Sequence, residues 1–247
     1  MSAAQDFELR SAAWRPLRSA AFVAALLFAG ACQTPSVAPT APIPTGPTLP
    51  TAPPAAQATR YSIRSDLSDV RFLVYRTGRL AKLGHNHVIQ PRTITGEIYL
   101  AADFQRSSFS LVVPVTDFHV DDPEARSVEG EEFAAPPDSD AIAGTTKNML
   151  GDKVLDAVRF PQIDIRSVAL IGPVWAPDIT LRIKLRGVER DITVPVAIDY
   201  RDGQLAVTAV FAINQTDFGI TPLSVLGGAL QVADTVRVRM RIVAQKG

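Results

Sequence analysis

Residues 235–242, TVRVRMRI, decide the fold class of this chain because apolar and polar side chains alternate in them without exception. Val236, Val238, Met240 and Ile242 fall on one face of an extended strand, and the three arginines between them fall on the other. This alternation is typical of an antiparallel strand with one buried and one solvated face. The segment therefore predicts a β-domain.

The same period of two recurs at 70–75, 94–100, 109–115, 179–185, 192–198 and 205–213. With the shorter stretches 61–64 and 161–167, these segments give about nine strands, and Asp202-Gly203 predicts a tight hairpin between two of them. Many short antiparallel strands with one apolar face close into a barrel or stack as a sandwich. Periodicity alone does not choose between the two.

One stretch departs from the strand pattern. Met149, Leu150 and Val154 stand at helical spacing after a threonine cap at 145 or 146, and Pro161 would end the segment. We therefore expect one short helix. The preceding residues, 121–140, are acidic and contain prolines, which predicts a long surface loop.

The first 31 residues have the features of a secretory signal peptide. Arg10, Arg15 and Arg18 precede an apolar run at 20–30 that ends in small residues. A run of this length is too short to cross a bilayer, which needs about 20 residues. We expect the chain to be exported to the periplasmic side of a cell envelope.

Cys32 is the only cysteine and follows Ala29-Gly30-Ala31. This arrangement resembles a bacterial lipobox, with Ala29 where leucine is usual, and an ordinary cut after Ala31 is the alternative. We predict that Cys32 is the mature N-terminus and carries lipid. It would then anchor the chain to a membrane surface without spanning it.

Residues 32–58 separate this end from the rest of the chain. They contain eight prolines and no charged residue, which predicts a semi-extended tether. The sequence therefore divides into a signal peptide at 1–31, a tether at 32–58 and one globular domain at 59–247. The 25 basic and 25 acidic residues balance, so nothing predicts nucleic-acid binding.

Five segments, in order, resemble the YceI-like family of bacterial exported lipid-binding proteins. They are YSIRSDLSDVRFLV at 61–74, LDAVRFPQIDIRS at 155–167, LRGVERDITVPV at 185–196, INQTDFGI at 213–220 and GGALQVADTVRVRM at 227–240. The resemblance implies an all-β domain with one short helix, folded as a lipocalin-like antiparallel barrel of about eight strands. Its interior would hold or carry a polyisoprenoid-like, quinone-like lipid, and no other cofactor is expected.

The inward-facing residues expected to contact that lipid are apolar: Phe72, Val74, Ile98, Leu111, Val113, Ile183, Val194, Val196, Val207 and Phe211. The same pattern fits a solid barrel in a purely structural lipoprotein. The chain departs from the family at Arg64 and Leu67, where Asp and His are frequent, and at Gln215, where Arg is frequent. Its joint at 83–89 is also shorter than usual. These departures bear on the identity of the ligand more than on the fold.

His85 and His87 point the same way on an extended segment, and they have three interpretations. They could bind a metal ion with His119 or with one of Asp117, Asp121 and Asp122, which would make a metal-binding or metal-dependent protein. They could brace a turn at Gly84. They could also lie at the mouth of the barrel and contact a polar lipid head, which is the interpretation we favour.

Catalysis has little support in the sequence. The serines lie in no nucleophile-elbow context, and no glycine-rich phosphate loop is present. The aspartates around His119 could form a paired-carboxylate site, so a hydrolase stays a distant alternative. We expect a binding protein with no catalytic residue.

Overall fold

The computed structural model describes residues 58–247. The predicted signal peptide, the lipidation of Cys32 and the tether up to residue 57 lie outside the described residues. Within the described part, no helix is both long enough and apolar enough to cross a membrane.

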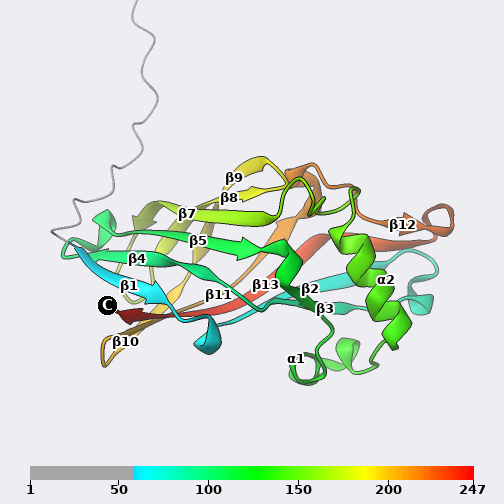
Figure 1. The fold of residues 1–247 in the computed structure, drawn as a ribbon, viewed down its shortest axis with the longest axis horizontal. Helices are drawn as coiled ribbons and strands as arrows, with labels where there is room; N and C mark the ends of the chain where they lie inside the picture. The colour runs from blue at the N-terminus through cyan, green and yellow to red at the C-terminus, as the bar shows by residue number, and fades with distance from the viewer. Residues whose placement is uncertain (1–57) are drawn as a thin grey trace, which may run out of the picture. The chain divides into compact units, whose positions relative to one another are not determined.

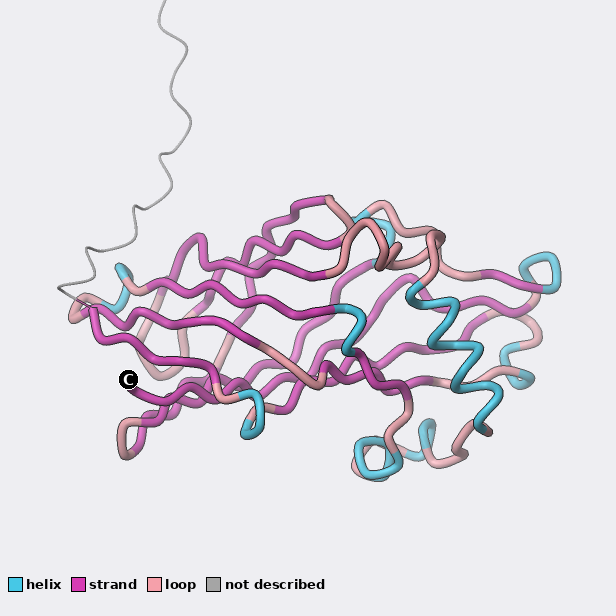
Figure 2. Tube along the Cα trace, viewed as in Figure 1, coloured by secondary structure: helices cyan, strands magenta, loops and turns pink. Residues whose placement is uncertain are grey.

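The described chain is mostly antiparallel sheet, with two α-helices and several single 3-10 turns (Figures 1 and 2). The helices are α1 (Pro123–Ser127) and α2 (Ser139–Leu150). The strands are β1 (Ala58–Ile63), β2 (Asp69–Thr77), β3 (His87–Pro91), β4 (Thr95–Ala101), β5 (Ser108–Pro114), β6 (Phe118–Val120), β7 (Gln162–Ile171), β8 (Asp178–Leu185), β9 (Val188–Pro195), β10 (Ala197–Arg201), β11 (Gln204–Asn214), β12 (Ser224–Val225) and β13 (Leu230–Lys246).

The sheet is organised around β13, which contains the segment TVRVRMRI. Its 17 residues pair with β2 and then β1 along one side and with β11 along the other. The main hydrogen-bonded order is β6-β3-β2-β13-β1-β4-β5-β7-β8-β9, while β10 pairs with β11 and β12 with β13. The sheet therefore curls so that β5, β7 and β8 lie across the interior from β2, β11 and β13 (Figure 1).

The sheet is not closed, so the predicted barrel is not confirmed. Among the described strands, β9 is an edge and no ladder joins it to β10 or β11. Pro195, the last residue of β9, has no N–H to extend a ladder. Beyond it the chain pairs with the β7–β8 loop instead: the Val196 N–H donates to the Pro177 carbonyl at 3.0 Å and the Ile198 N–H to the Trp175 carbonyl at 2.9 Å.

The predicted strand count of about eight was too low, since 13 strands are present in the described range. Two of the additional strands, β6 and β12, have only three and two residues. Such lengths are too short to show a period. The single predicted strand at 192–198 is also divided, because it breaks after Pro195 into β9 and β10.

The helix prediction also needs correction. There are two helices, and α2 begins six residues before Thr145, at Ser139. Asp138 caps it, because its carboxylate accepts a hydrogen bond from the Ala141 N–H at 2.8 Å. The acidic stretch before α2 is not a solvated loop either: Phe133 is 1% exposed and Arg126 is 4% exposed.

The predicted hairpin at Asp202-Gly203 is confirmed. It joins β10 to β11 through two residues with φ values of 52° and 76°. Positive φ at both central positions belongs to the type I′ turn, which Asp-Gly favours and whose twist matches that of paired strands.

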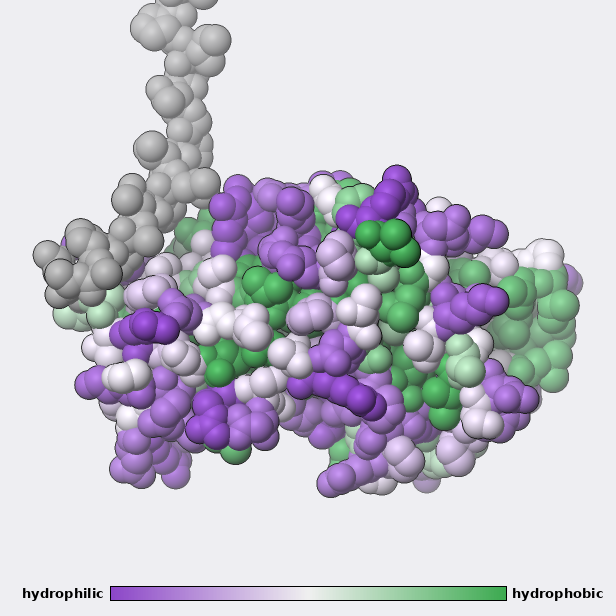
Figure 3. Space-filling view, in the orientation of Figure 1, coloured by the Kyte–Doolittle hydropathy of each residue, from purple (hydrophilic) through white to green (hydrophobic). Residues whose placement is uncertain are grey.

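Apolar side chains line the interior of the curled sheet, and a second small core lies on its outside. Leu73, Val88, Ala125 and Phe133 form this outer core, which attaches α1 to β2 and β3. The surface in view is largely hydrophilic, with an apolar tip at the end where β12 lies (Figure 3). In this region Leu226 is 65% exposed.

Candidate functional site

The interior contains a cavity of about 360 Å³, the larger of two described here. This volume is within the range of small-molecule sites, about 300–1,000 Å³. No described residue of its wall is charged, and only Ser107, Ser108 and Tyr200 carry a side-chain hydroxyl. Such a wall can hold an apolar molecule but offers few groups that could orient a polar one.

Most of the apolar residues singled out from the sequence lie in this wall. Eight of the ten line the larger cavity: Phe72, Ile98, Leu111, Val113, Ile183, Val196, Val207 and Phe211. Val74 lines the smaller cavity, and Val194 is buried in the core without lining either one. The alternation did not identify Phe104 and Val174, because both lie in connections between strands.

A second cavity, of about 200 Å³, adjoins the first. The two share Phe72, Ile163, Leu185 and Ile213 as wall residues. The smaller cavity differs from the larger one in its polar groups: His87 from β3, Thr145 and Asn148 from α2, and Gln215 after β11. One interior therefore has an apolar compartment and a compartment with a polar side.

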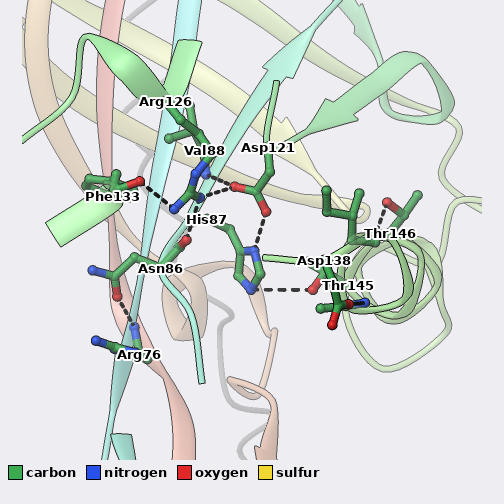
Figure 4. Close-up of polar contacts among 12 residues, drawn as sticks. Arg76, Asn86, His87, Val88, Asp121, Arg126, Phe133, Asp138, Thr145 and Thr146 are labelled. Atoms are coloured by element: carbon green, nitrogen blue, oxygen red, sulfur yellow. Dashed lines mark hydrogen bonds and ion pairs between the residues drawn. The ribbon is translucent and has the colours of Figure 1, made fainter. Parts of the chain in front are cut away.

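His87 is held by a carboxylate on the side away from Thr145. Its Nδ1 lies 2.6 Å from Oδ2 of Asp121, whose side chain is fully buried (Figure 4). Asp121 directly follows β6, and two hydrogen bonds with the Val88 backbone align it with β3. The Asp121 N–H donates to the Val88 carbonyl at 2.7 Å, and the Val88 N–H donates to Oδ1 of Asp121 at 2.9 Å.

A buried arginine completes this network. Arg126 on α1 donates through Nη1 to Oδ1 of Asp121 at 2.5 Å and to the Asn86 carbonyl at 2.8 Å. Its Nη2 donates to the carbonyls of Phe133 and Ala135 at 2.7 and 2.9 Å. The guanidinium thus neutralises Asp121 and ties the 121–135 segment to β3 (Figure 4).

The local sequence explains how Asp121 and Arg126 reach these positions. Asp121 has φ 58°, a left-handed conformation that Asp tolerates better than most residues, and it turns the chain out of β6. Asp122 then caps α1 by accepting from the N–H groups of Glu124 and Ala125 at 3.0 and 3.1 Å. Pro123 occupies the first turn, where its missing donor costs nothing.

The electrostatics of Asp121 fix the orientation of the imidazole. Burial raises the pKa of the Asp121 carboxyl, but hydrogen bonds from His87, the Val88 N–H and Arg126 outweigh this effect, so the pKa lies below its usual value. Asp121 is therefore an acceptor only, and Nδ1 of His87 must carry the hydrogen between them. In the neutral imidazole this leaves Nε2 as an acceptor, 3.4 Å from Oγ1 of Thr145.

The structure does not bring the three histidines together. The His85 ring lies 6.4 Å from that of His87, but His85 lines neither cavity. His119 pairs with Gln90 in the ladder, which places it on the opposite sheet face from His87. Within residues 58–247 there is no group of three or more His, Cys, Asp or Glu side chains placed to hold a metal ion.

Thr145, His87 and Asp121 have the connectivity of a hydroxyl–imidazole–carboxylate triad. The distance between Oγ1 and Nε2, 3.4 Å, is longer than the reach of about 2.6–3.2 Å expected for an activated nucleophile. The hydroxyl is also a secondary one within the helix α2, where β-branching restricts its rotation. The arrangement is better suited to holding a ligand group by hydrogen bonds.

Comparison with known proteins agrees with this fold. A family model described as a YceI-like domain matches residues 61–244. The structure of BcnA from Burkholderia cenocepacia is similar, with a TM-score of 0.56 and 15% identity over 74% of this chain and 99% of the other.

A polyisoprenoid binding domain from Saccharophagus degradans has a TM-score of 0.51 and 12% identity over 76% of this chain and 98% of the other. No match is found among curated proteins. The family model covers well over half of the sequence, and the chain therefore belongs to the YceI-like domain family.

Proposed function

We propose that this protein binds one lipid with a polyisoprenoid-like tail in its interior. The observation that carries this proposal is the larger cavity, whose described wall is uncharged and apolar apart from Ser107, Ser108 and Tyr200. A slim hydrocarbon chain gains about 25 cal/mol for each Å² of apolar surface that it removes from water. Family membership supports the same ligand class, since a similar structure is that of a polyisoprenoid binding domain.

The two other candidate functions fit the structure less well. A solid structural barrel does not agree with two adjoining cavities of about 360 and 200 Å³. A metal-binding protein built on His85 and His87 would need a third ligand, but Nδ1 of His87 is already engaged by Asp121 and His119 lies on the other face.

Native mass spectrometry of the full chain purified from a bacterial host tests this function, with metal analysis of the same sample. We expect one bound lipid for each chain and no stoichiometric metal. A chain that stays free of lipid after incubation with a prenyl alcohol in detergent would contradict the proposal. A metal that survives dialysis would favour the metal-binding alternative.

We further propose that the protein works in the bacterial envelope, exported by residues 1–31 and anchored through an acylated Cys32. The support is the order of basic residues, apolar run, small residues and cysteine, followed by the proline-rich tether. We expect Cys32→Ser to move the protein from the membrane fraction to the soluble fraction of a host that processes lipoproteins. Ser36→Ala, within the tether, is the control. Wild-type protein in the soluble fraction would contradict the anchor.

A further inference from the structure

We propose that the smaller cavity selects a lipid whose head carries a hydroxyl group, either an alcohol or a phenol, through His87 and Thr145. This inference rests on the proposed lipid-binding function, because the tail would occupy the larger cavity. The apolar compartment and the compartment with the polar side adjoin, with four wall residues in common, and the proposal places the tail of one amphiphile in the first and its head in the second.

The charges around the smaller cavity favour a neutral head. Its described wall contains no Lys, Arg, Asp or Glu. Behind the imidazole, the carboxylate of Asp121 is already balanced by Arg126 at 2.5 Å. A phosphate head would therefore place uncompensated negative charge in a largely apolar site, and an ammonium head would find no free carboxylate there.

Hydrogen-bond direction then selects among neutral heads. Asp121 accepts from Nδ1, so the neutral imidazole presents Nε2 to the cavity as an acceptor. Among residues 58–247, Nε2 has a single weak contact, the Thr145 hydroxyl at 3.4 Å. A ligand O–H can donate to Nε2 while its oxygen accepts from Oγ1 of Thr145, which satisfies both groups (Figure 4).

Other oxygen-bearing heads can hydrogen-bond to only one of these two groups, the Thr145 hydroxyl, and not to Nε2 of His87. An ether or a quinone carbonyl can accept from Thr145, but it cannot donate to Nε2. Binding would then remove Nε2 of His87 from water without giving it a new hydrogen bond, which lowers the affinity about tenfold or more. Of the two remaining polar wall groups, Gln215 already donates through its amide nitrogen to the Ala233 carbonyl at 2.8 Å. The Asn148 amide can both donate and accept, so it does not distinguish among these heads.

Three probes with one tail test the inference on the full chain: geranylgeraniol, its methyl ether and geranylgeranyl phosphate. We expect the alcohol to bind about tenfold or more tightly than either of the other two. Thr145→Val, which keeps the side-chain shape, should weaken binding of the alcohol and of the ether alike by about two- to tenfold, because the oxygen of each accepts from this hydroxyl, and the alcohol should stay the tighter of the two. Thr146→Val is the matched control, because its hydroxyl donates to the Ile142 carbonyl and does not line the cavity.

The outcomes separate the two proposals. Equal affinities for alcohol and ether, with Thr145→Val neutral, would overturn the head-group selection and leave the lipid-binding function standing. Tighter binding of the phosphate would also overturn it. Failure of all three probes to bind would overturn the proposed function as well.

A fourth measurement distinguishes the two sources of the hydroxyl. It compares the affinities of a prenylated benzoquinol and of the corresponding quinone under anaerobic conditions. Tighter binding of the quinol than of both the quinone and geranylgeraniol assigns a phenol, and tighter binding of geranylgeraniol assigns an alcohol. Both results support an O–H donor, and preference for the quinone would contradict it.

Discussion

The two cavities are adjacent but are built in different ways. The larger one is walled by side chains that alternate along the strands, and many apolar residues of similar size would serve there equally well. The polar side of the smaller one depends on His87, which is held by Asp121, which in turn is held by Arg126. The apolar compartment is thus a general consequence of the sheet, while the polar side needs particular residues brought together from distant parts of the chain.

The largest expected effect tests the apolar core of the curled sheet, outside both cavity walls. Val194 is 1% exposed in the main core, and Thr193 beside it faces solvent. We expect Val194→Asp to lower the free energy of unfolding by more than about 3 kcal/mol, because it buries a carboxylate without a partner. Thr193→Asp should change it by less than about 0.5 kcal/mol. Similar urea midpoints for the two variants would show that the strand faces are assigned wrongly.

The next largest effect tests the support of the polar side. Asp121→Asn removes the charge that balances Arg126 and leaves one acceptor oxygen where two serve Arg126, the Val88 N–H and His87. Breaking a buried ion pair from one side costs about 3–5 kcal/mol. We expect a loss of this size in urea unfolding at pH 7. Asp122→Asn is the matched control, since Asn still caps a helix.

Acid conditions sharpen this second prediction. The pKa of Asp121 is depressed in the folded state. The carboxylate therefore makes its full contribution to the free energy of unfolding above the pKa of an unfolded carboxyl, about 3.9. This contribution is lost as the pH falls through the lower pKa that Asp121 has in the folded protein. The difference in stability between wild type and Asp121→Asn should therefore narrow below about pH 3.9. A difference that stays constant with pH would show that the carboxylate charge is not the cause.

The smallest expected effect on stability separates tail binding from folding. Val207 lines the larger cavity, whereas Val210 on the same strand faces out and is 57% exposed. We expect Val207→Phe to fill part of the cavity, reduce affinity for geranylgeraniol about tenfold or more, and change unfolding by about 1 kcal/mol or less. Val210→Phe should alter neither quantity. Unchanged binding in Val207→Phe would place the tail outside this cavity.

The amino-acid sequence predicts the structure best where a single strand carries its own signal. Alternation assigned the buried faces of β8, β11 and β13, because a period of two is a local property. It could not show that the sheet stays open beside Pro195, since closure depends on which strands become neighbours.

The polar site was the harder part to predict. His87 and Asp121 lie 34 positions apart, and nothing local to either residue indicates their contact. The segment Asp121–Arg126 resembles a solvated loop in composition, although Asp122-Pro123 is a recognisable helix start. That signal could have located α1, but it does not indicate that the side chain of Arg126, within this helix, is buried.

A crystal structure with a prenyl alcohol that carries bromine at the far end of its tail tests the central claim most directly. With the hydroxyl between His87 and Thr145, the account predicts an anomalous bromine peak inside the larger cavity, within contact distance of about 4 Å of apolar wall residues such as Phe211 and Val207. A peak on the outer surface of the sheet, with the larger cavity empty, would contradict it.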